Sequence, residues 1–234
     1  MSITCYMPAK TDPSPLSLGA VLFDLDGTLV DTAADFEIAV NALRHDYALP
    51  PLPAPQIAER VSDGSTALTR LALSLPADAA ELPERRQQLL GHYRQSLGLA
   101  AALYPSLDNV LLWLQQQQIP WGIVTNKPER FAIDLLEKLG LGHCPVLVCP
   151  EHVEQAKPHP EPLLLACNRL GIKPESALYI GDHERDILAG RAAAMRTVIA
   201  GYGYIPATES CIDWGADYHV EQPDELLALL ASLL

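Results

Sequence analysis

Residues 20–28 read Ala20-Val21-Leu22-Phe23-Asp24-Leu25-Asp26-Gly27-Thr28 and contain the clearest structural signal in this 234-residue chain. Four apolar residues bounded by polar ones are typical of a strand that is buried on both faces of a sheet. Because residues two apart in an extended segment point the same way, Asp24 and Asp26 share one side, while Leu25 faces apolar packing on the other. Gly27 permits the sharp turn by which the chain leaves the sheet. A solvated aspartate turn or a helix cap would give the same D-x-D-G pattern, so this segment alone does not establish a site.

From residue 31 the apolar residues change to helical spacing. The first helical pattern runs from Phe36 to Tyr47, and Asp31 or Thr32 can cap its start. Further helical patterns cover residues 64–75, 81–98 and 106–118. No convincing strand lies between residues 31 and 118, so this stretch is predicted to be helical.

Beyond residue 118, strand-like runs alternate with helical patterns. The predicted strands are Trp121–Thr125, Val146–Cys149, Ala177–Gly181, Arg196–Ala200 and Tyr218–Val220. The predicted helices cover about 129–139, 160–170, 184–194 and 223–234. Such alternation implies a parallel sheet with helices on both faces. We therefore expect an α/β core from residues 19–30 and 104–234, a helical domain at 31–103 inserted after the first strand, and an N-terminal tail at 1–18.

The composition is that of a folded protein with an acidic surface. The chain is 49% hydrophobic and 19% charged, which provides enough apolar material for a core and excludes a disordered chain. Its net charge of −13 comes from 29 acidic and 16 basic residues, with no cluster of Lys or Arg. Nucleic acid and anionic membranes are therefore not expected partners. An anionic substrate would need local cations or a metal ion to bind against this overall field.

The cysteine pattern and the N-terminal residues predict a cytoplasmic protein. The five cysteines include no C-x-x-C pair, residues 1–18 are polar and interrupted by proline, and no apolar run approaches the ~20 residues that span a bilayer. The nearby residues His143, Cys144, Cys149 and His152 suggest zinc. However, Cys144 and Cys149 flank a predicted buried strand, and buried cysteines are common as small apolar residues, so we do not predict a zinc site.

Three later segments place polar groups at or beside the ends of predicted strands. Thr125 and Asn126 provide a hydroxyl and an amide, Lys157 a cation in a proline-rich loop, and Asp182 and Asp186 two carboxylates. Each is ordinary alone, since strand-end threonines are usually structural and most lysines are solvated. Ligands of open α/β sheets bind at the carboxyl ends of the strands. Together with the two aspartates after the first strand, these groups supply the parts of a phosphoryl-transfer site.

With these motifs in this order, the chain resembles the haloacid dehalogenase superfamily, in particular its phosphatases with a helical cap after the first strand. The resemblance covers residues 20–234. It implies a Rossmann-like α/β core with a parallel sheet, a helical cap domain inserted after the first strand, and a Mg²⁺-dependent phosphatase. Dehalogenases of the superfamily lack the second aspartate, because a leaving halide needs no proton. Asp26 therefore favours a phosphatase or a phosphomutase.

The resemblance also implies a role for each motif residue. Asp24 is expected to attack phosphorus and form an aspartyl-phosphate, with Asp26 acting first as acid and then as base. Thr125 and Lys157 are expected to bind phosphoryl oxygens and to neutralise the charge that shifts during transfer. Asp186 is expected to orient a metal-bound water or Lys157. The expected Mg²⁺ ligands are Asp24, the backbone carbonyl of Asp26, and Asp182.

Further segments refine the resemblance: Trp121–Pro128, Cys149–Val153, Lys157–Pro162, Gly201–Ile205 and Trp214–Asp217. They are similar to the N-acetylmuramic acid 6-phosphate phosphatases of bacterial cell-wall peptidoglycan recycling, a group often labelled phosphoglycolate phosphatases. The expected substrate is therefore N-acetylmuramic acid 6-phosphate, with 2-phosphoglycolate as the alternative. A sugar phosphomutase and a non-catalytic module that binds a phosphorylated ligand are also left open. A monomer or a weak homodimer is expected.

The residues that select the substrate are expected to surround the phosphate site. The expected substrate contacts are Thr125, Asn126, Lys127, Lys157 and Gly64. Lys127 and Arg130 lie beside Thr125 and are candidates to meet a substrate carboxylate, although a solvated helix position is the simpler explanation of Arg130. The loop at residues 60–65 is expected to face the core, because Gly64 permits a tight turn between two helical patterns.

Overall fold

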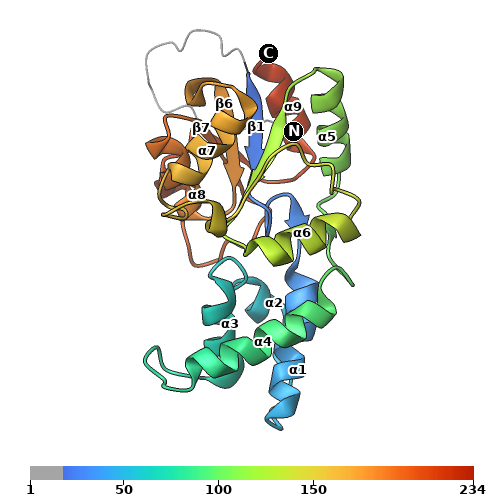
Figure 1. Ribbon diagram of the computed structural model, residues 1–234, viewed down its shortest axis with the longest axis vertical. Helices are drawn as coiled ribbons and strands as arrows, with labels where there is room; N and C mark the ends of the chain where they lie inside the picture. The colour runs from blue at the N-terminus through green and yellow to red at the C-terminus, as the bar shows by residue number, and fades with distance from the viewer. Residues whose placement is uncertain (1–17) are drawn as a thin grey trace.

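The computed structural model describes residues 18–234 of the chain (Figure 1). The predicted tail at residues 1–18 lies outside the described residues except for Leu18, and so does Cys5. A sheet with helices packed around it forms one part of the molecule, and a group of helices beyond one end of the sheet forms the other (Figure 1).

The core contains a six-stranded sheet in the order β5-β4-β1-β6-β7-β8. Its strands are β1 (Ala20–Phe23), β4 (Trp121–Val124), β5 (Leu147–Val148), β6 (Ala177–Gly181), β7 (Arg196–Ala200) and β8 (Tyr218–Val220). All neighbouring pairs are parallel. The predicted parallel α/β core is therefore confirmed, with small differences at the strand ends. The chain runs outward from β1 in both directions, so the strand order reverses there, and such a reversal is where ligands bind in this class of sheet.

Alternate residues of β1 pack on opposite faces of the sheet, as a strand buried on both sides requires. Val21 and Phe23 belong to a large apolar cluster with α5 (Leu107–Gln116), α6 (Glu129–Lys138) and α9 (Glu225–Ser232). Leu22 belongs to a second cluster. The helices of that second cluster are α7 (Glu161–Leu170) and α8 (Glu184–Ala192). The helices therefore cover both faces, as predicted.

The helical insertion, which we define as residues 31–103, contains four helices. They are α1 (Ala33–Asp46), α2 (Ala54–Ala58), α3 (Gly64–Leu73) and α4 (Leu82–Ser96). Helices α1 and α4 pack side by side, and Phe36 stacks on Tyr93 with ring centroids 4.0 Å apart. The buried Asp35 carboxylate accepts hydrogen bonds from the backbone N–H groups of Gly98, Ala100 and Ala101 and thereby ties the start of α1 to the segment after α4.

A short antiparallel pair joins the insertion to the core and corrects the prediction that no strand lies between residues 31 and 118. Strand β2 (Val30–Asp31) pairs with β3 (Ala102–Leu103). Two residues per strand are too few to produce a recognisable alternation of apolar and polar residues. The short helix α2 was likewise not predicted, because five residues span little more than one turn and cannot show a repeated helical spacing of apolar positions. Because β2 pairs with β3, the two connections between the core and the insertion lie side by side.

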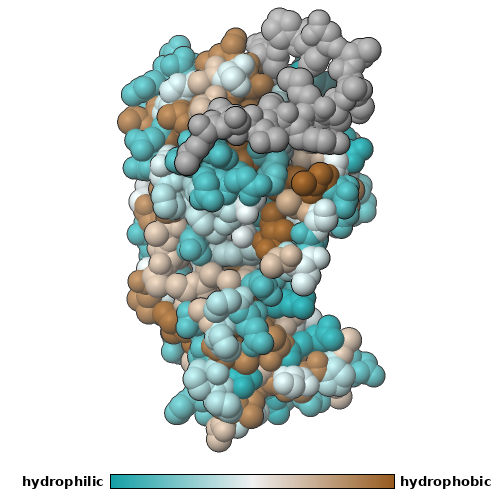
Figure 2. Space-filling model, turned by 180° about the vertical axis from the view of Figure 1, so that it is seen from behind, coloured by the Kyte–Doolittle hydropathy of each residue, from teal (hydrophilic) through white to brown (hydrophobic). Residues whose placement is uncertain are grey.

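Three 3₁₀ segments complete the described structure: η1 (Pro150–His152), η2 (Pro174–Ser176) and η3 (Cys211–Trp214). Hydrophilic and hydrophobic residues are interspersed over the face seen in Figure 2, on the core as well as on the insertion. Within residues 18–234, none of the helices combines the length and the apolar character needed to cross a membrane.

Candidate active site

The polar residues of the predicted motifs meet at one edge of the sheet. Asp24 follows β1, Thr125 follows β4 and Asp182 follows β6, and these three strands are neighbours in the sheet. Parallel strands place their carboxyl ends at the same edge, so residues more than 150 positions apart become neighbours. One direct sign is the hydrogen bond from the Thr28 hydroxyl to Asp182 Oδ1, at 2.9 Å.

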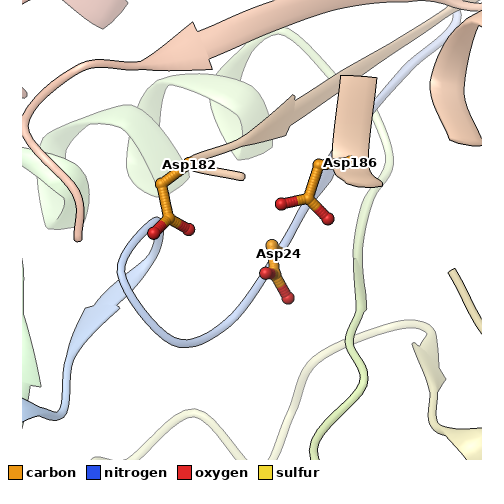
Figure 3. Close-up of side chains that lie close together, drawn as sticks. All are labelled: Asp24, Asp182 and Asp186. Atoms are coloured by element: carbon orange, nitrogen blue, oxygen red, sulfur yellow. The ribbon is translucent and has the colours of Figure 1, made fainter. Parts of the chain in front are cut away.

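Three carboxyl groups lie together at this edge. Asp24, Asp182 and Asp186 each offer an oxygen, and these atoms all lie within 4.8 Å of one another. Figure 3 shows them where the loop after β1 meets the segment that joins β6 to α8. Asp186 lies in the first turn of α8 and accepts a hydrogen bond from the N–H of His183. Oxygen-only ligands suit a hard divalent cation such as Mg²⁺.

Lys157 is the buried cation of this group. Its ammonium lies 2.9 Å from Asp24 Oδ1 and 2.7 Å from Asp186 Oδ1. It also donates to the Val124 carbonyl and to the Tyr179 hydroxyl. Burial lowers the pKa of Lys157, but Asp186 and Asp24 outweigh this and raise it above its ordinary value, so the group stays charged. Asp186 therefore contacts Lys157, as one of the two roles expected for Asp186 requires.

Asp24 holds one carboxyl oxygen in place and keeps the other available. Oδ1 accepts a hydrogen bond from the Leu25 N–H at 2.7 Å and contacts Lys157. Among the described residues, no hydrogen bond reaches Oδ2. Burial, opposed by Lys157 and reinforced by Asp186 and Asp26, raises the pKa of Asp24 to about 6. Without a further cation this carboxylate is only partly compensated.

Asp182 is enclosed by its neighbours. Its oxygens accept hydrogen bonds from the Thr28 hydroxyl, from the Ser62 hydroxyl and from the N–H of Tyr204. Burial and the nearby charges of Asp24 and Asp186 raise its pKa to about 7. Gly27, with φ of 82°, passes so close that a Cβ there would lie 2.3 Å from Asp182 Oδ2. The glycine is thus required both by the left-handed turn and by this close approach.

Asp26 faces the insertion and is tied to it. Its Oδ1 accepts hydrogen bonds from the Thr32 hydroxyl at 2.6 Å and from the Lys127 ammonium at 2.8 Å. The same ammonium donates to the Tyr93 hydroxyl at 2.6 Å and lies 5.1 Å from the centre of the Phe36 ring. Burial lowers the pKa of Lys127, but Asp26 and Tyr93 outweigh this and raise it. Lys127 therefore connects the second motif aspartate to the stacked aromatic pair of the insertion.

The other candidate residues that follow β4 differ in their exposure and in their hydrogen-bond partners. Thr125 is 4% exposed, and its hydroxyl accepts a hydrogen bond from the Lys127 N–H. The Asn126 side chain holds the neighbouring loop, donating to the Lys157 carbonyl and accepting from the Lys157 N–H. Arg130 is exposed and lies over the Phe131 ring, with its guanidinium carbon 4.7 Å from the ring centre. It does not line the cavity between the core and the insertion.

A cavity of about 280 Å³ lies between the core and the insertion. The core contributes Asp24, Asp26, Thr125, Asn126, Lys127, Lys157 and Arg185 to its wall, and the insertion contributes Phe36, residues 61–66, Arg86, Leu90 and Tyr93. Gly64, one of the predicted substrate contacts, lies at this wall with φ of 84°. A hollow on the outer side of the insertion, between α1 and α4, shares no residue with it.

The loop at residues 60–65 faces the core, as its sequence predicted. The Ser62 hydroxyl lies 3.0 Å from Asp182 Oδ2, and the Arg185 guanidinium donates to the Ser62 carbonyl. The His183 ring lies 3.7 Å from the Asp63 carboxylate. The insertion therefore closes over the carboxylate group in this structure, and a closed site excludes water from the reaction.

Sequence reasoning missed several residues of this wall. Arg86, Tyr93 and Arg185 were not singled out, because an arginine or a tyrosine in a helical pattern is normally a solvated or packing residue. The Tyr204 hydroxyl accepts hydrogen bonds from the N–H groups of Thr32 and Ala33 and donates to Asp31. It therefore fixes the start of the insertion against the core.

The cysteines and histidines that suggested zinc form no metal group in residues 18–234; the one group found there is the aspartate group. His152 lies 2.7 Å from the Glu129 carboxylate, and the Cys144 thiol contacts the Val146 carbonyl. Burial raises the pKa of Cys144 to about 11, so its thiol stays protonated.

Comparisons with known proteins agree with this geometry. Residues 21–200 match the family model described as haloacid dehalogenase-like hydrolase. The chain is 42% identical to the N-acetylmuramic acid 6-phosphate phosphatase of Pseudomonas aeruginosa, over 92% of this chain and 96% of that protein. It is also 42% identical to a phosphoglycolate phosphatase of Xanthomonas campestris pv. campestris, over 88% of this chain and 94% of that protein.

One solved structure shows the same arrangement of elements. A predicted phosphoglycolate phosphatase from Haemophilus somnus superposes with a TM-score of 0.80 at 26% identity, covering 91% of this chain and 98% of that chain.

Proposed function

The chain belongs to the haloacid dehalogenase-like hydrolases and is a phosphatase, and from this premise we propose that it hydrolyses N-acetylmuramic acid 6-phosphate to N-acetylmuramic acid and phosphate. The observation that carries the proposal is the cavity that opens on Asp24. Lys157 and the carboxylates of Asp182 and Asp186 lie close to the Asp24 side chain. The identity of the substrate is supported by the relative of that name, which matches nearly the whole chain. The reaction belongs to peptidoglycan recycling in the cytoplasm, and the free thiols of Cys144, Cys149, Cys167 and Cys211 support that location.

Asp24 is the proposed nucleophile. Its Oδ2 attacks phosphorus while Oδ1 stays bound to the Leu25 N–H and to Lys157. The bond between phosphorus and the sugar oxygen breaks, and an aspartyl-phosphate forms on Asp24. Water then attacks the same phosphorus, which releases phosphate and restores the carboxylate. Lys157 and the Thr125 hydroxyl stabilise the charge on the transferring group.

Asp26 is the proposed acid and base. It donates a proton to the leaving sugar oxygen and later accepts one from the attacking water. Thr32 and Lys127 both contact Oδ1, which leaves Oδ2 to carry the proton. Lys127 therefore positions Asp26, and this contact supports a different role from the substrate binding that the sequence suggested.

Mg²⁺ is the proposed cofactor, held by Asp24, Asp182 and the backbone carbonyl of Asp26. The three-aspartate group fits a divalent cation, because the pKa values of Asp24 and Asp182 are raised by repulsion and burial that a bound cation would relieve. When bound, Mg²⁺ supplies positive charge that allows an anionic nucleophile to approach an anionic phosphate. Asp186 forms an ion pair with Lys157 and thereby holds Lys157 beside the proposed metal ligands.

We expect Mg²⁺ to bind more weakly as the pH falls through 7 and 6. Carboxylates bind metal as anions, so protons compete with it, and the pKa values of Asp182 (about 7) and Asp24 (about 6) place the competition in this window. The metal-free protein should also lose stability as the pH rises from about 4 to 7, because its folded state retains protons that the unfolded state releases. Thermal unfolding with and without Mg²⁺ at about pH 5.5, 6.5 and 8 measures both effects. An equal Mg²⁺-induced rise in Tm at all three pH values would contradict the assignment.

The substrate is tested by comparing kcat/KM for N-acetylmuramic acid 6-phosphate, N-acetylglucosamine 6-phosphate, glucose 6-phosphate and 2-phosphoglycolate. We expect the first to be preferred by at least about tenfold, because a second anchoring group contributes transition-state binding. A preference for N-acetylglucosamine 6-phosphate over its lactylated counterpart would exclude the proposed substrate but not the phosphatase activity.

The second candidate substrate is 2-phosphoglycolate, favoured by the Xanthomonas relative of that name. It would be indicated by the highest kcat/KM in the same panel. A mutase would convert a sugar phosphate into an isomer without net phosphate release. A non-catalytic module would bind a phosphate ester tightly without hydrolysing p-nitrophenyl phosphate in Mg²⁺.

A further inference from the structure

We propose that Arg86 of α4 determines specificity by binding a carboxylate of the substrate while the phosphate occupies the site at Asp24. This inference rests on the proposed function and refines it. It assigns the substrate class as a sugar phosphate that carries a carboxylate-bearing substituent, and it assigns the recognition of that carboxylate to a residue of the insertion.

The cavity is lined by catalytic residues of the core and by residues of the insertion. Asp24 and Lys157 line it from the core, and Arg86, Ser65 and Thr66 line it from the insertion. A molecule whose phosphate lies against Asp24 therefore extends toward the insertion within one continuous space. The groups there contact the part of the substrate that distinguishes one phosphate ester from another.

Arg86 is held in place without being neutralised. Its Nε donates to the Ser65 hydroxyl at 2.7 Å. Within residues 18–234, the ion pairs formed at the insertion do not include Arg86. Because Ser65 engages Nε, the two Nη groups remain as a pair of parallel donors. That geometry matches the two oxygens of a carboxylate.

Its neighbour Arg85 shows the opposite situation. The Arg85 guanidinium lies 2.9 Å from the Glu84 carboxylate and 5.1 Å from the centre of the Tyr47 ring. Arg85 is absent from the cavity wall. Two adjacent arginines of one helix thus differ in both direction and partners, which provides a matched control.

The other cations of the cavity come from the core, and two of them are paired with carboxylates. Lys157 and Lys127 each contact a carboxylate of the catalytic group. Arg185 also has a neutral partner, the Ser62 carbonyl, but it projects from α8 of the core. In a protein with a net charge of −13, an anionic substituent needs a local cation. Arg86 is the cation that the insertion contributes to this cavity, and its side-chain hydrogen bond within residues 18–234 is to a neutral hydroxyl.

The test compares two substrates that differ in the lactyl group alone, N-acetylmuramic acid 6-phosphate and N-acetylglucosamine 6-phosphate. Arg86→Met should lower kcat/KM for the lactylated substrate by on the order of 10- to 100-fold, the range expected for a lost charged hydrogen bond. The same variant should change kcat/KM for N-acetylglucosamine 6-phosphate by less than about threefold. Arg86→Lys should retain part of the preference, and Arg85→Met should retain all of it.

The outcomes separate this inference from the proposed function. If Arg86→Met leaves the Tm unchanged and lowers kcat/KM for both substrates equally, or for neither, Arg86 does not bind the carboxylate. The proposed phosphatase activity would remain. If the wild-type protein hydrolyses both substrates with equal efficiency, no carboxylate is recognised and the inference is overturned together with the proposed substrate. If it hydrolyses no phosphate ester in Mg²⁺, the proposed function itself fails. Selective loss for the lactylated substrate alone supports Arg86.

Discussion

Asp24→Asn abolishes turnover, with an expected loss of kcat of roughly four orders of magnitude or more. An amide is not a nucleophile toward phosphorus, so no aspartyl-phosphate forms and only binding and charge stabilisation remain. The fold should survive. Asparagine has nearly the volume of aspartate, and its Oδ1 can still accept the hydrogen bond from the Leu25 N–H and the contact from Lys157.

The measurement is steady-state hydrolysis of the preferred substrate in Mg²⁺, with mass spectrometry to verify that the amide has not reverted to a carboxylate. Asp134→Asn is the matched control, because Asp134 is exposed on α6 and should leave kcat unchanged. Near-normal Mg²⁺-dependent activity of Asp24→Asn would show that another residue is the nucleophile.

Lys157→Met is expected to reduce both activity and stability. The Lys157 side chain is 1% exposed and lies between the carboxylates of Asp24 and Asp186. Without it, two neighbouring carboxylates are left without their counter-ion in a buried site. Removing one partner of a buried ion pair typically lowers the free energy of unfolding by about 3–5 kcal/mol. We expect kcat/KM to fall by on the order of 10²- to 10³-fold, because a charged group at the transferring phosphate is lost.

Urea unfolding and steady-state kinetics measure the two losses separately. Lys173→Met is the control, since Lys173 is exposed and should change neither. The double variant Lys157→Met/Asp186→Asn should recover part of the stability, because one of the uncompensated charges is removed, but none of the activity. A single variant that is fully stable and fully active would show that Lys157 is dispensable to the site.

Much of the catalytic site was predictable because local rules act there. The apolar run at 20–23 predicted a buried strand, and the alternation of residues 24–26 predicted that Asp24 and Asp26 share one side. The parallel topology then implied that Asp182 and Thr125 meet them. These inferences need only the periodicity of a strand and the rule that parallel strands end at one edge.

The contacts of the insertion were not predictable in the same way. Arg85 and Arg86 are adjacent in one helical pattern, and nothing in their order indicates that Arg86 alone turns toward the cavity. Lys127 was expected to meet a substrate, yet Asp26 and Tyr93 engage its ammonium. The strands β2 and β3 are too short to leave a pattern.

By itself, the sequence determined the α/β class, the inserted helices and the set of aspartates, threonine and lysine at the strand ends. This was possible because the pattern of neighbouring residues indicates which strands are buried and that the strands run parallel. Tertiary structure alone decided that Lys157 lies between Asp24 and Asp186, that Lys127 binds Asp26, and that Arg86 faces the cavity. The Lys157 contacts depend on how the loop that carries Lys157 packs against the core, and the position of Arg86 depends on how α4 packs over the sheet. Such packing joins side chains far apart in the chain and has no periodicity to reveal it.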